Sequence, residues 1–497
     1  MSRSSSHAWA IYGWAAVAIA LQLLTCAIVF RGLIHTPLEV SAGSASSAFN
    51  PKASSNGAVP KTPVPTTPRQ SAPADSPTPS AASLTPKRWL IVCLDGVPLS
   101  MIQSLWNRGH FREFSAPTAV VSSFPSDTET AVTVALHAPP APGYEHSYYD
   151  RAENRKRGGP LTTIFGAGIP YIQSLDYDTN GWFKVLSYLA PQWVYRSDLA
   201  RFNKKFQASN APVFLAHLAT SDALLHVRTA EQAEPLILEF ESAVSNIYRD
   251  AHGELGVILF SDHGDTETLS HEVPVESFLA ARGWRIRDSL AAPRDVVIPA
   301  YGLVGFAAIY CQPESIERLA EDLRGVQGAD VIVSHEPGLQ TATIRAADSN
   351  ATAHLAWSSD GRRYRYTARG GDPLGLAVVF DDLRAKGKLD TGGFAEDEDL
   401  FAATSSSLFP DSAARVRDWA TDHVRNPADV LVSFRPGYDH GSRILDHIVT
   451  LVGTHGGLEK SASLAFAMAT YPLAPSIRLG DLLPANLLDK SKSQTQR

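Results

Sequence analysis

The apolar residues of this chain fall into runs that predict an α/β fold. Three continuous apolar runs, RWLIVCLD, VFLAHLA and LGVILFSD, begin at Arg88, Val213 and Leu255. Apolar character without alternation is typical of strands that are buried on both faces of a parallel sheet. Helical patterns lie between or after these runs, for example at 231–253 and 313–328. Strands that alternate with helices predict a three-layer sandwich around a mostly parallel sheet.

A second pattern occupies the chain between about 266 and 440. The segments TATIRAA, ATAHLAW and RRYRYTAR alternate apolar and polar residues, and turn-forming residues separate them at 348–350 and 359–361. Alternation with a period of two predicts antiparallel strands in a hairpin or meander. We therefore expect an inserted α+β cap at about 266–440, within a catalytic domain that spans 88–485.

The first residues contain the longest apolar run. Residues 8–34 carry a single charge, Arg31, and about 20 apolar residues suffice to span a bilayer. The run exceeds the apolar core of a secretory signal, which favours an uncleaved transmembrane helix within a tail and anchor at 1–39. A cleaved signal is the alternative, with small residues at 40–42. A short tail before one span predicts a domain on the periplasmic or extracellular side of an inner or plasma membrane.

The segment that follows the anchor is a tether. Residues 40–87 are mostly Ser, Ala, Pro and Thr, without periodicity, which predicts a disordered or extended linker. A second disordered segment is expected at 486–497.

Bulk composition excludes some classes of protein. The chain has 497 residues and a formal net charge of −7, so it has no global signature of nucleic-acid binding. Its three cysteines lack the spacing of a metal site. We expect Cys93 and Cys311 to be buried thiols, although a bridge between them stays open.

Each of the three buried runs leads to residues that can bind a metal. Asp95 ends the first run, and Asp262 and His263 lie at the end of the third. Asp222 follows the second run, and His226 comes four residues later, on the same face of a helical turn. Because the carboxyl ends of parallel strands meet at one edge of a sheet, we expect these side chains to converge.

A histidine near the C-terminus completes the set. His455 precedes two glycines in LVGTHGG, which permit close approach of the backbone, and His440 in GYDHGS is the alternative. Three Asp and three His without a thiolate suit zinc or another borderline divalent ion. We expect two ions, the first held by Asp95, Asp262 and His263 and the second by Asp222, His226 and His455.

The candidate nucleophile is Ser123, which precedes an aromatic residue and Pro125. With Pro125 at the first helical position, Ser123 would lie at a helix N-terminus, where N–H groups and the helix dipole favour an anion. A serine hydroxyl needs a base or a metal to become a good nucleophile. The rival hydroxyls are those of Ser122, Thr128 and Thr130.

Together these motifs resemble the alkaline phosphatase superfamily, and within it the type I phosphodiesterase/nucleotide pyrophosphatase family. The resemblance is carried by LDGV, SSFPS, SDALLH, SDHGD and THGG, between Arg88 and about Pro475. It implies two zinc ions and a phosphorylated Ser123, which would also be a metal ligand. It further implies substrate contacts by Phe124 and Ser126. A sulfatase is disfavoured, because Asp127 stands where that pattern has Arg.

The expected function is hydrolysis of phosphate mono- or diesters, with a nucleotide, lipid or glycan head group as the substrate. One alternative is a membrane-tethered transferase that passes the phospho group to an alcohol of an envelope lipid or glycan. Another is a non-catalytic binding protein on the same fold. The complete set of metal ligands favours the hydrolase.

Overall fold

The structure is a computed structural model that describes residues 86–159, 168–421, 423–442 and 449–488. The predicted anchor, nearly all of the predicted linker and most of the predicted C-terminal tail lie outside these residues. Within the described ranges, no helix is both long enough and apolar enough to cross a membrane.

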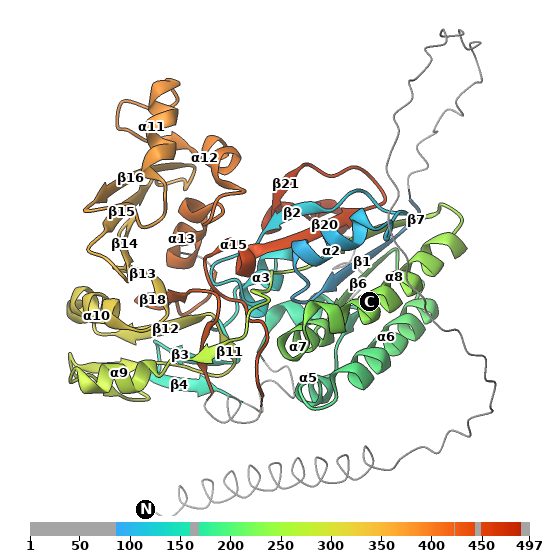
Figure 1. Ribbon diagram of the computed structural model, residues 1–497, viewed down its shortest axis with the longest axis horizontal. Helices are drawn as coiled ribbons and strands as arrows, with labels where there is room; N and C mark the ends of the chain where they lie inside the picture. Colours follow the sequence, from blue (N-terminus) through green and yellow to red (C-terminus); the bar gives the residue numbers. More distant parts are fainter. Residues whose placement is uncertain (1–85, 160–167, 422, 443–448, 489–497) are drawn as a thin grey trace, which may run out of the picture. The chain divides into compact units, whose positions relative to one another are not determined.

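The first sheet is built around the three predicted strands. β1 (Arg88–Leu94) pairs in parallel with β6 (Val213–Leu218) on one side and with β7 (Leu255–Phe260) on the other. The prediction of a central parallel sheet from the three apolar runs is therefore confirmed, and the carboxyl ends of all three strands lie at one edge of the sheet (Figure 1).

Four further strands complete this sheet, in the order β21-β2-β20-β7-β1-β6-β5. β20 alone runs against its neighbours β7 and β2. The other added strands share the direction of β1. Their bounds are β2 (Thr118–Val121), β5 (Tyr177–Asp178), β20 (Leu464–Ala469) and β21 (Ser476–Arg478).

Helices cover both faces of this sheet. Val92 and its alternate neighbours in β1 pack into a core with α2 (Leu99–Asn107) and α8 (Ala230–Asp250). Cys93 and the other alternate residues pack into a second core with α3 (Thr128–Ala135). Burial on both faces requires apolar residues at successive positions, which explains why the run does not alternate. The remaining helices near this sheet are α5 (Gly181–Leu186), α6 (Pro191–Ala208), α7 (Thr220–Val227) and α15 (Lys460–Ser463).

The chain between residues 285 and 434 forms a second sheet of nine strands, in the order β17-β16-β15-β14-β13-β18-β12-β10-β9 (Figure 1). The predicted meander is confirmed, because β14 pairs antiparallel with β15 and β15 with β16. The strands are β9 (Arg285–Ile286), β10 (Asp295–Val297), β12 (Phe306–Cys311), β13 (Ala329–His335), β14 (Thr341–Ala346), β15 (Thr352–Trp357), β16 (Arg363–Arg369), β17 (Ala395–Glu396) and β18 (Val430–Phe434).

Helices and short strands surround the second sheet. One core of this region contains Trp419 of α13 together with Phe124, which precedes α3 of the first sheet. Cys311 in β12 is a buried free thiol, as is Cys93, so the bridge that the sequence left open does not form. The other elements are α9 (Val275–Ala281), α10 (Ile316–Asp322), α11 (Ala377–Ala385), α12 (Asp397–Thr404), α13 (Ser412–Thr421), β3 (Ser147–Asp150), β4 (Arg155–Gly158), β8 (His271–Glu272), β11 (Leu303–Val304) and β19 (Tyr438–Gly441).

A close contact between β1 and β7 allows a test of packing against the second core, which contains α3. Gly256 lies opposite Trp89, and a Cβ atom at position 256 would lie 2.6 Å from the Trp89 ring. We expect Gly256→Val to lower the free energy of unfolding by about 1–3 kcal/mol, because overpacking displaces the ring. Urea unfolding measures this loss. If Gly256→Val costs as much in a Trp89→Leu background, the contact with the ring is not the cause.

Candidate metal centre and nucleophile

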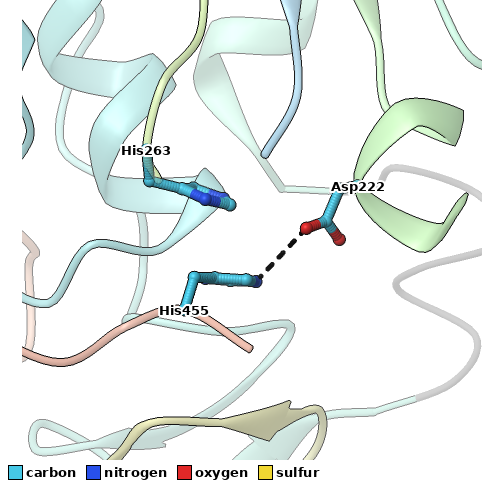
Figure 2. Close-up of side chains that lie close together, drawn as sticks. All are labelled: Asp222, His263 and His455. Carbon is cyan, nitrogen blue, oxygen red and sulfur yellow. Dashed lines mark ion pairs between the residues drawn. The ribbon is translucent and has the colours of Figure 1, made fainter. Parts of the chain in front are cut away.

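The predicted ligands meet at the carboxyl edge of the first sheet. Asp95, Asp262 and His263 present ligand atoms within 4.8 Å of one another. A second group with the same spacing contains Asp222, His455 and again His263. The His263 and His455 rings stack with their centroids 3.8 Å apart, and Asp222 faces His455 (Figure 2). The structure thus brings together five of the six predicted Asp and His ligands, and His263 takes part in both groups.

The sixth predicted ligand, His226, lies beside the second group. Its Nε2 atom is 3.2 Å from Oδ2 of Asp222, and its ring centroid is 5.2 Å from that of His455. His440, the alternative to His455, lies apart from both groups. Its Nδ1 atom hydrogen-bonds to the Val273 carbonyl. The structure therefore places His455, and not His440, with the ligands.

Three histidines are oriented by backbone carbonyls. Nδ1 of His226 donates to Gly453 O at 2.8 Å, Nδ1 of His263 to Gly264 O at 3.0 Å, and Nδ1 of His455 to Ser126 O at 2.9 Å. A carbonyl oxygen only accepts, so Nδ1 carries a proton in each ring and Nε2 is the nitrogen left for a metal. This is the usual arrangement of metal-binding histidines. Burial opposes the shift, but the charge of Asp222 raises the pKa of His226 to about 9 and the charge of Asp262 raises the pKa of His263 to about 10, so an ion bound there would displace the Nε2 proton of these two rings.

The charges of the two groups also fit divalent cations. Oδ1 of Asp222 and Oδ2 of Asp262 are buried and have no hydrogen-bond partner among the described residues. Burial and the nearby charge of Asp95 raise the pKa of Asp262. Burial and the neighbouring His263 lower the pKa of His455 to about 3, so His455 is neutral. Zinc-like ions bind carboxylates and neutral imidazoles, and their charge would offset the repulsion between the carboxylates.

Gly96 permits the close approach of these ligands. It has φ +70°, and a Cβ atom there would lie 2.5 Å from Oδ1 of Asp222. Its N–H donates to Oδ1 of Asp262 at 3.2 Å. A side chain at this position would both strain the backbone and displace a ligand.

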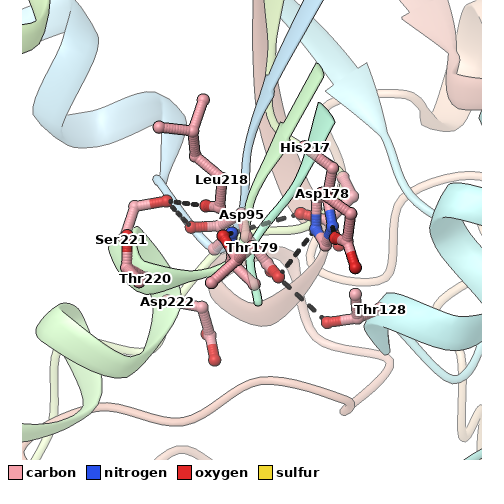
Figure 3. A network of polar contacts seen from close by, with 12 residues as sticks. Asp95, Thr128, Asp178, Thr179, His217, Leu218, Thr220, Ser221 and Asp222 are labelled. Carbon is pink, nitrogen blue, oxygen red and sulfur yellow. Dashed lines mark hydrogen bonds and ion pairs between the residues drawn. The ribbon is translucent and has the colours of Figure 1, made fainter. Parts of the chain in front are cut away.

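Sequence reasoning missed His217, which orients Asp95. His217 is fully buried, and its Nε2 lies 3.0 Å from Oδ2 of Asp95 while its Nδ1 lies 2.9 Å from Oδ1 of Asp178 (Figure 3). Lys184 in turn pairs with Asp178 at 3.1 Å. Burial lowers the pKa of His217, but the two carboxylates outweigh it and raise this pKa to about 10. The available signal was a single polar residue inside the apolar run VFLAHLA.

The hydroxyl of Thr128 contacts the side chains of two predicted ligands. Its Oγ1 lies 3.3 Å from Oδ1 of Asp95 and 3.3 Å from Nε2 of His263 (Figure 3). Thr128 is the first residue of α3, and Asp127 is its N-cap. The prediction that Pro125 begins the helix is therefore wrong by three positions. Thr128 was only a rival in the sequence, because the start of the helix seemed to lie earlier.

The predicted nucleophile and substrate contacts are buried under this helix start. Ser123 Oγ donates to Pro125 O at 2.7 Å and lies 3.1 Å from Thr130 Oγ1. Ser126 is fully buried, and its hydroxyl is within hydrogen-bond distance of Ser123 O. Phe124 is also fully buried. The structure thus gives Phe124 and Ser126 no exposed surface with which to bind a substrate.

A group of carboxyl side chains surrounds the start of α3. Glu129 Oε1 lies 3.0 Å from Nε2 of His146. Burial, and then the charge of Glu129, raise the pKa of Asp127. Burial raises the pKa of Glu145 to about 8, although the Gly302 N–H donates to Glu145 and opposes the shift. A neutral Asp127 beside Thr128 would not repel an anion, so Asp127 is compatible with a negatively charged substrate at the start of α3.

The described chain is thus an α/β protein with side chains that could bind a metal, and with the Thr128 hydroxyl beside them, at the carboxyl edge of its mostly parallel sheet. No family model and no curated protein matches it. Among solved structures it is similar to human ectonucleotide pyrophosphatase/phosphodiesterase 5, with 12% identity over 81% of this chain and 95% of that chain and a TM-score of 0.43. It is also similar to phosphonoacetate hydrolase from Sinorhizobium meliloti 1021, with 12% identity over 82% and 96% and a TM-score of 0.41.

The contacts of His217 predict its effect on metal binding. We expect His217→Leu to weaken binding of a divalent metal by roughly 10–100-fold, because Asp95 loses the partner that orients it. Competition with a chromophoric chelator measures the affinity. His440→Leu is the matched control, since this buried histidine lies outside both ligand groups. Equal losses in the two variants would contradict the assigned role of His217.

The raised pKa of Glu145 predicts a pH dependence of stability. The folded protein holds this proton up to a pH of about 8, whereas the unfolded chain loses it near 4.5. The folded state therefore binds more protons within this window, and the free energy of unfolding should fall as pH rises, by at most about 1.4 kcal/mol per pH unit. Urea unfolding across this window should show a flatter slope for Glu145→Gln. The exposed control Glu314→Gln should keep the wild-type slope, and a flatter slope there would contradict the assignment.

Proposed function

We propose that this protein is a two-metal phosphoric ester hydrolase that works through a covalent phosphothreonine at Thr128. The observation that carries the proposal is the position of the Thr128 hydroxyl, 3.3 Å from both Asp95 and His263. Both residues belong to the first ligand group. The same residue begins α3, so free backbone N–H groups and the helix dipole favour a phosphoryl anion beside it.

The residues of the site suit an in-line displacement in two steps. Divalent ions held here, with zinc the best match to the donors, would lower the pKa of the hydroxyl and bind phosphoryl oxygens. Thr128 Oγ1 forms a bond to phosphorus while the bond to the leaving oxygen breaks on the opposite side. Water then attacks the phosphothreonine and restores the hydroxyl. Thr128 Oγ1 lies beside Asp95 and His263, the residues that would hold an ion next to the nucleophile.

Ser123 takes a supporting role in this proposal. Its hydroxyl bonds to Pro125 O, in the turn that leads into α3, and to Thr130 Oγ1, in the first turn of α3. A nucleophile needs an approach path for phosphorus, and these contacts already occupy the Ser123 hydroxyl. Thr128 therefore replaces Ser123 as the proposed site of phosphorylation.

The substrate class follows from the reaction and from the chain around it. We propose a phosphate ester, mono- or diester, with a nucleotide, lipid or glycan leaving group. The predicted anchor at 1–39 would hold this activity at the outer face of an inner or plasma membrane.

The test is hydrolysis of chromogenic phosphate diester, phosphate monoester and sulfate ester by the purified full-length chain, with zinc and with a chelator. We expect chelator-sensitive hydrolysis of a phosphate ester and a loss on the order of 10⁴-fold in kcat for Thr128→Ala, as is typical when a nucleophile is removed. Mass spectrometry of rapidly quenched enzyme should find phosphate on the peptide that contains Thr128.

Ser123→Ala is the matched control, because it removes a neighbouring hydroxyl of the same turn. We expect this variant to keep its kcat within about tenfold of wild type, as for the loss of a supporting hydrogen bond. Loss of activity in Ser123→Ala with full activity in Thr128→Ala would return the role to Ser123. An inactive, zinc-loaded and folded wild type would overturn hydrolysis itself.

A further inference from the structure

A buried arginine from the second sheet region reaches the backbone under the nucleophile. Arg415 belongs to α13 and is 3% exposed. Its guanidinium donates to Ser123 O through both Nε, at 3.2 Å, and Nη2, at 2.9 Å. Nη2 also bonds to the hydroxyls of Ser126, at 3.0 Å, and Ser463, at 2.7 Å. Nη1 donates to two more carbonyls, Leu458 O and Pro410 O.

The acceptors of Arg415 are all neutral. Asp411, the acid whose charge acts on Arg415, hydrogen-bonds instead to Arg478, and no carboxylate accepts from Arg415 among the described residues. Burial lowers the pKa of Arg415 to about 9, an unusual shift for a guanidinium. A buried cation is costly unless it is well bonded. Six hydrogen bonds compensate the cost of burying the Arg415 guanidinium. The proposed phosphoryl site at Thr128, next to the loop that Arg415 contacts, gives a reason for a cation at this position.

The backbone segment that Arg415 contacts at Ser123 leads to Thr128, the proposed nucleophile. We call residues 122–127 the nucleophile loop, since Thr128 follows it. Ser126 of this loop accepts from Arg415 through its hydroxyl and from His455 Nδ1 through its carbonyl. Its N–H donates to Gly456 O at 3.3 Å. One residue thus connects Arg415 with both a metal ligand and the turn that presents the nucleophile.

We propose that Arg415 is a positioning residue, which fixes the nucleophile loop and His455 and so couples the second sheet region to the phosphoryl-transfer site. This inference rests on the proposed function for its effect on catalysis. Its planar fork bridges Ser123 O, Ser126 Oγ and Ser463 Oγ at once, which a lysine ammonium cannot do with the same geometry. Without the fork, the loop and Thr128 lose a fixed position relative to the ligands.

Arg478 offers a matched control. It also joins the two sheet regions, because it lies in β21 and pairs with Asp397 at the start of α12 and with Asp411. It differs in that its charge is neutralised by carboxylates and that it makes no hydrogen bond to the nucleophile loop. Arg478→Gln therefore measures the cost of losing a partly buried arginine that joins the two regions.

The experiment compares wild type, Arg415→Gln, Arg415→Lys and Arg478→Gln as full-length, zinc-loaded chains. Hydrogen–deuterium exchange of peptides covering 120–130 reports the nucleophile loop, and a chromogenic phosphate ester reports kcat and KM. For Arg415→Gln we expect faster exchange in the loop and a fall in kcat of roughly 100-fold, as for a displaced reacting group, with KM changed by less than about threefold. Arg415→Lys should recover less than about a tenth of the lost kcat. Arg478→Gln should leave both readouts near wild type.

Further outcomes separate this inference from the proposed function. If Arg415→Gln does not fold, Ser463→Ala removes one acceptor and should lower kcat by roughly two- to tenfold, as for one lost hydrogen bond. If wild type hydrolyses no ester, the proposed function fails, and exchange of the loop still decides whether Arg415 positions it. The inference would be overturned if the exchange rate of the loop and the kcat of Arg415→Gln both lay within about twofold of the values for Arg478→Gln.

Discussion

The repulsion among buried carboxylates at the carboxyl edge of the first sheet is the constraint on which the site depends. Asp95 and Asp262 belong to one ligand group and Asp222 to the other, and the two groups share His263. One carboxylate oxygen of Asp222 and one of Asp262 lack hydrogen-bond partners among the described residues. Such charges are stable in a protein interior only with compensating cations. Histidine nitrogens, fixed by backbone carbonyls, share the same space. The arrangement offers two overlapping groups of side chains that could hold a metal, and the Thr128 hydroxyl contacts one of them.

The sequence predicted the parts of this site that depend on local pattern. Each apolar run became a buried strand, and the carboxyl ends of parallel neighbours brought Asp95, Asp262 and His263 together. Tertiary contacts decided the parts that were missed. The start of α3 follows a loop that is held by Arg415 and Gly456. Arg415 lies 292 residues from Ser123 in the chain, and Gly456 is farther still. His217 gains its role from Asp178 on a neighbouring strand, which a single sequence does not reveal.

The nucleophile loop lies where the two sheet regions meet. Phe124 packs into a core with residues of the second sheet and α13, and Arg415 donates to the Ser123 carbonyl before it and to the Ser126 hydroxyl after it. The second sheet region therefore contributes to the site mainly by holding this loop. The position of Thr128 is set by the loop that precedes it and by the contacts of its hydroxyl with Asp95 and His263. Both supports are needed, because a hydroxyl reacts with phosphorus only along a narrow range of directions.

The hydrogen-bond partners that orient the candidate ligands differ in how easily a mutation can remove them. His226, His263 and His455 are oriented by main-chain carbonyls, which every amino acid supplies. Asp95 is oriented by the side chain of His217, which one nucleotide change can remove. Genetic variation should therefore damage the two ligand groups unequally. The group that contains Asp95 is the more fragile, and a variant that had lost its orientation would keep Asp222 and His455 in place.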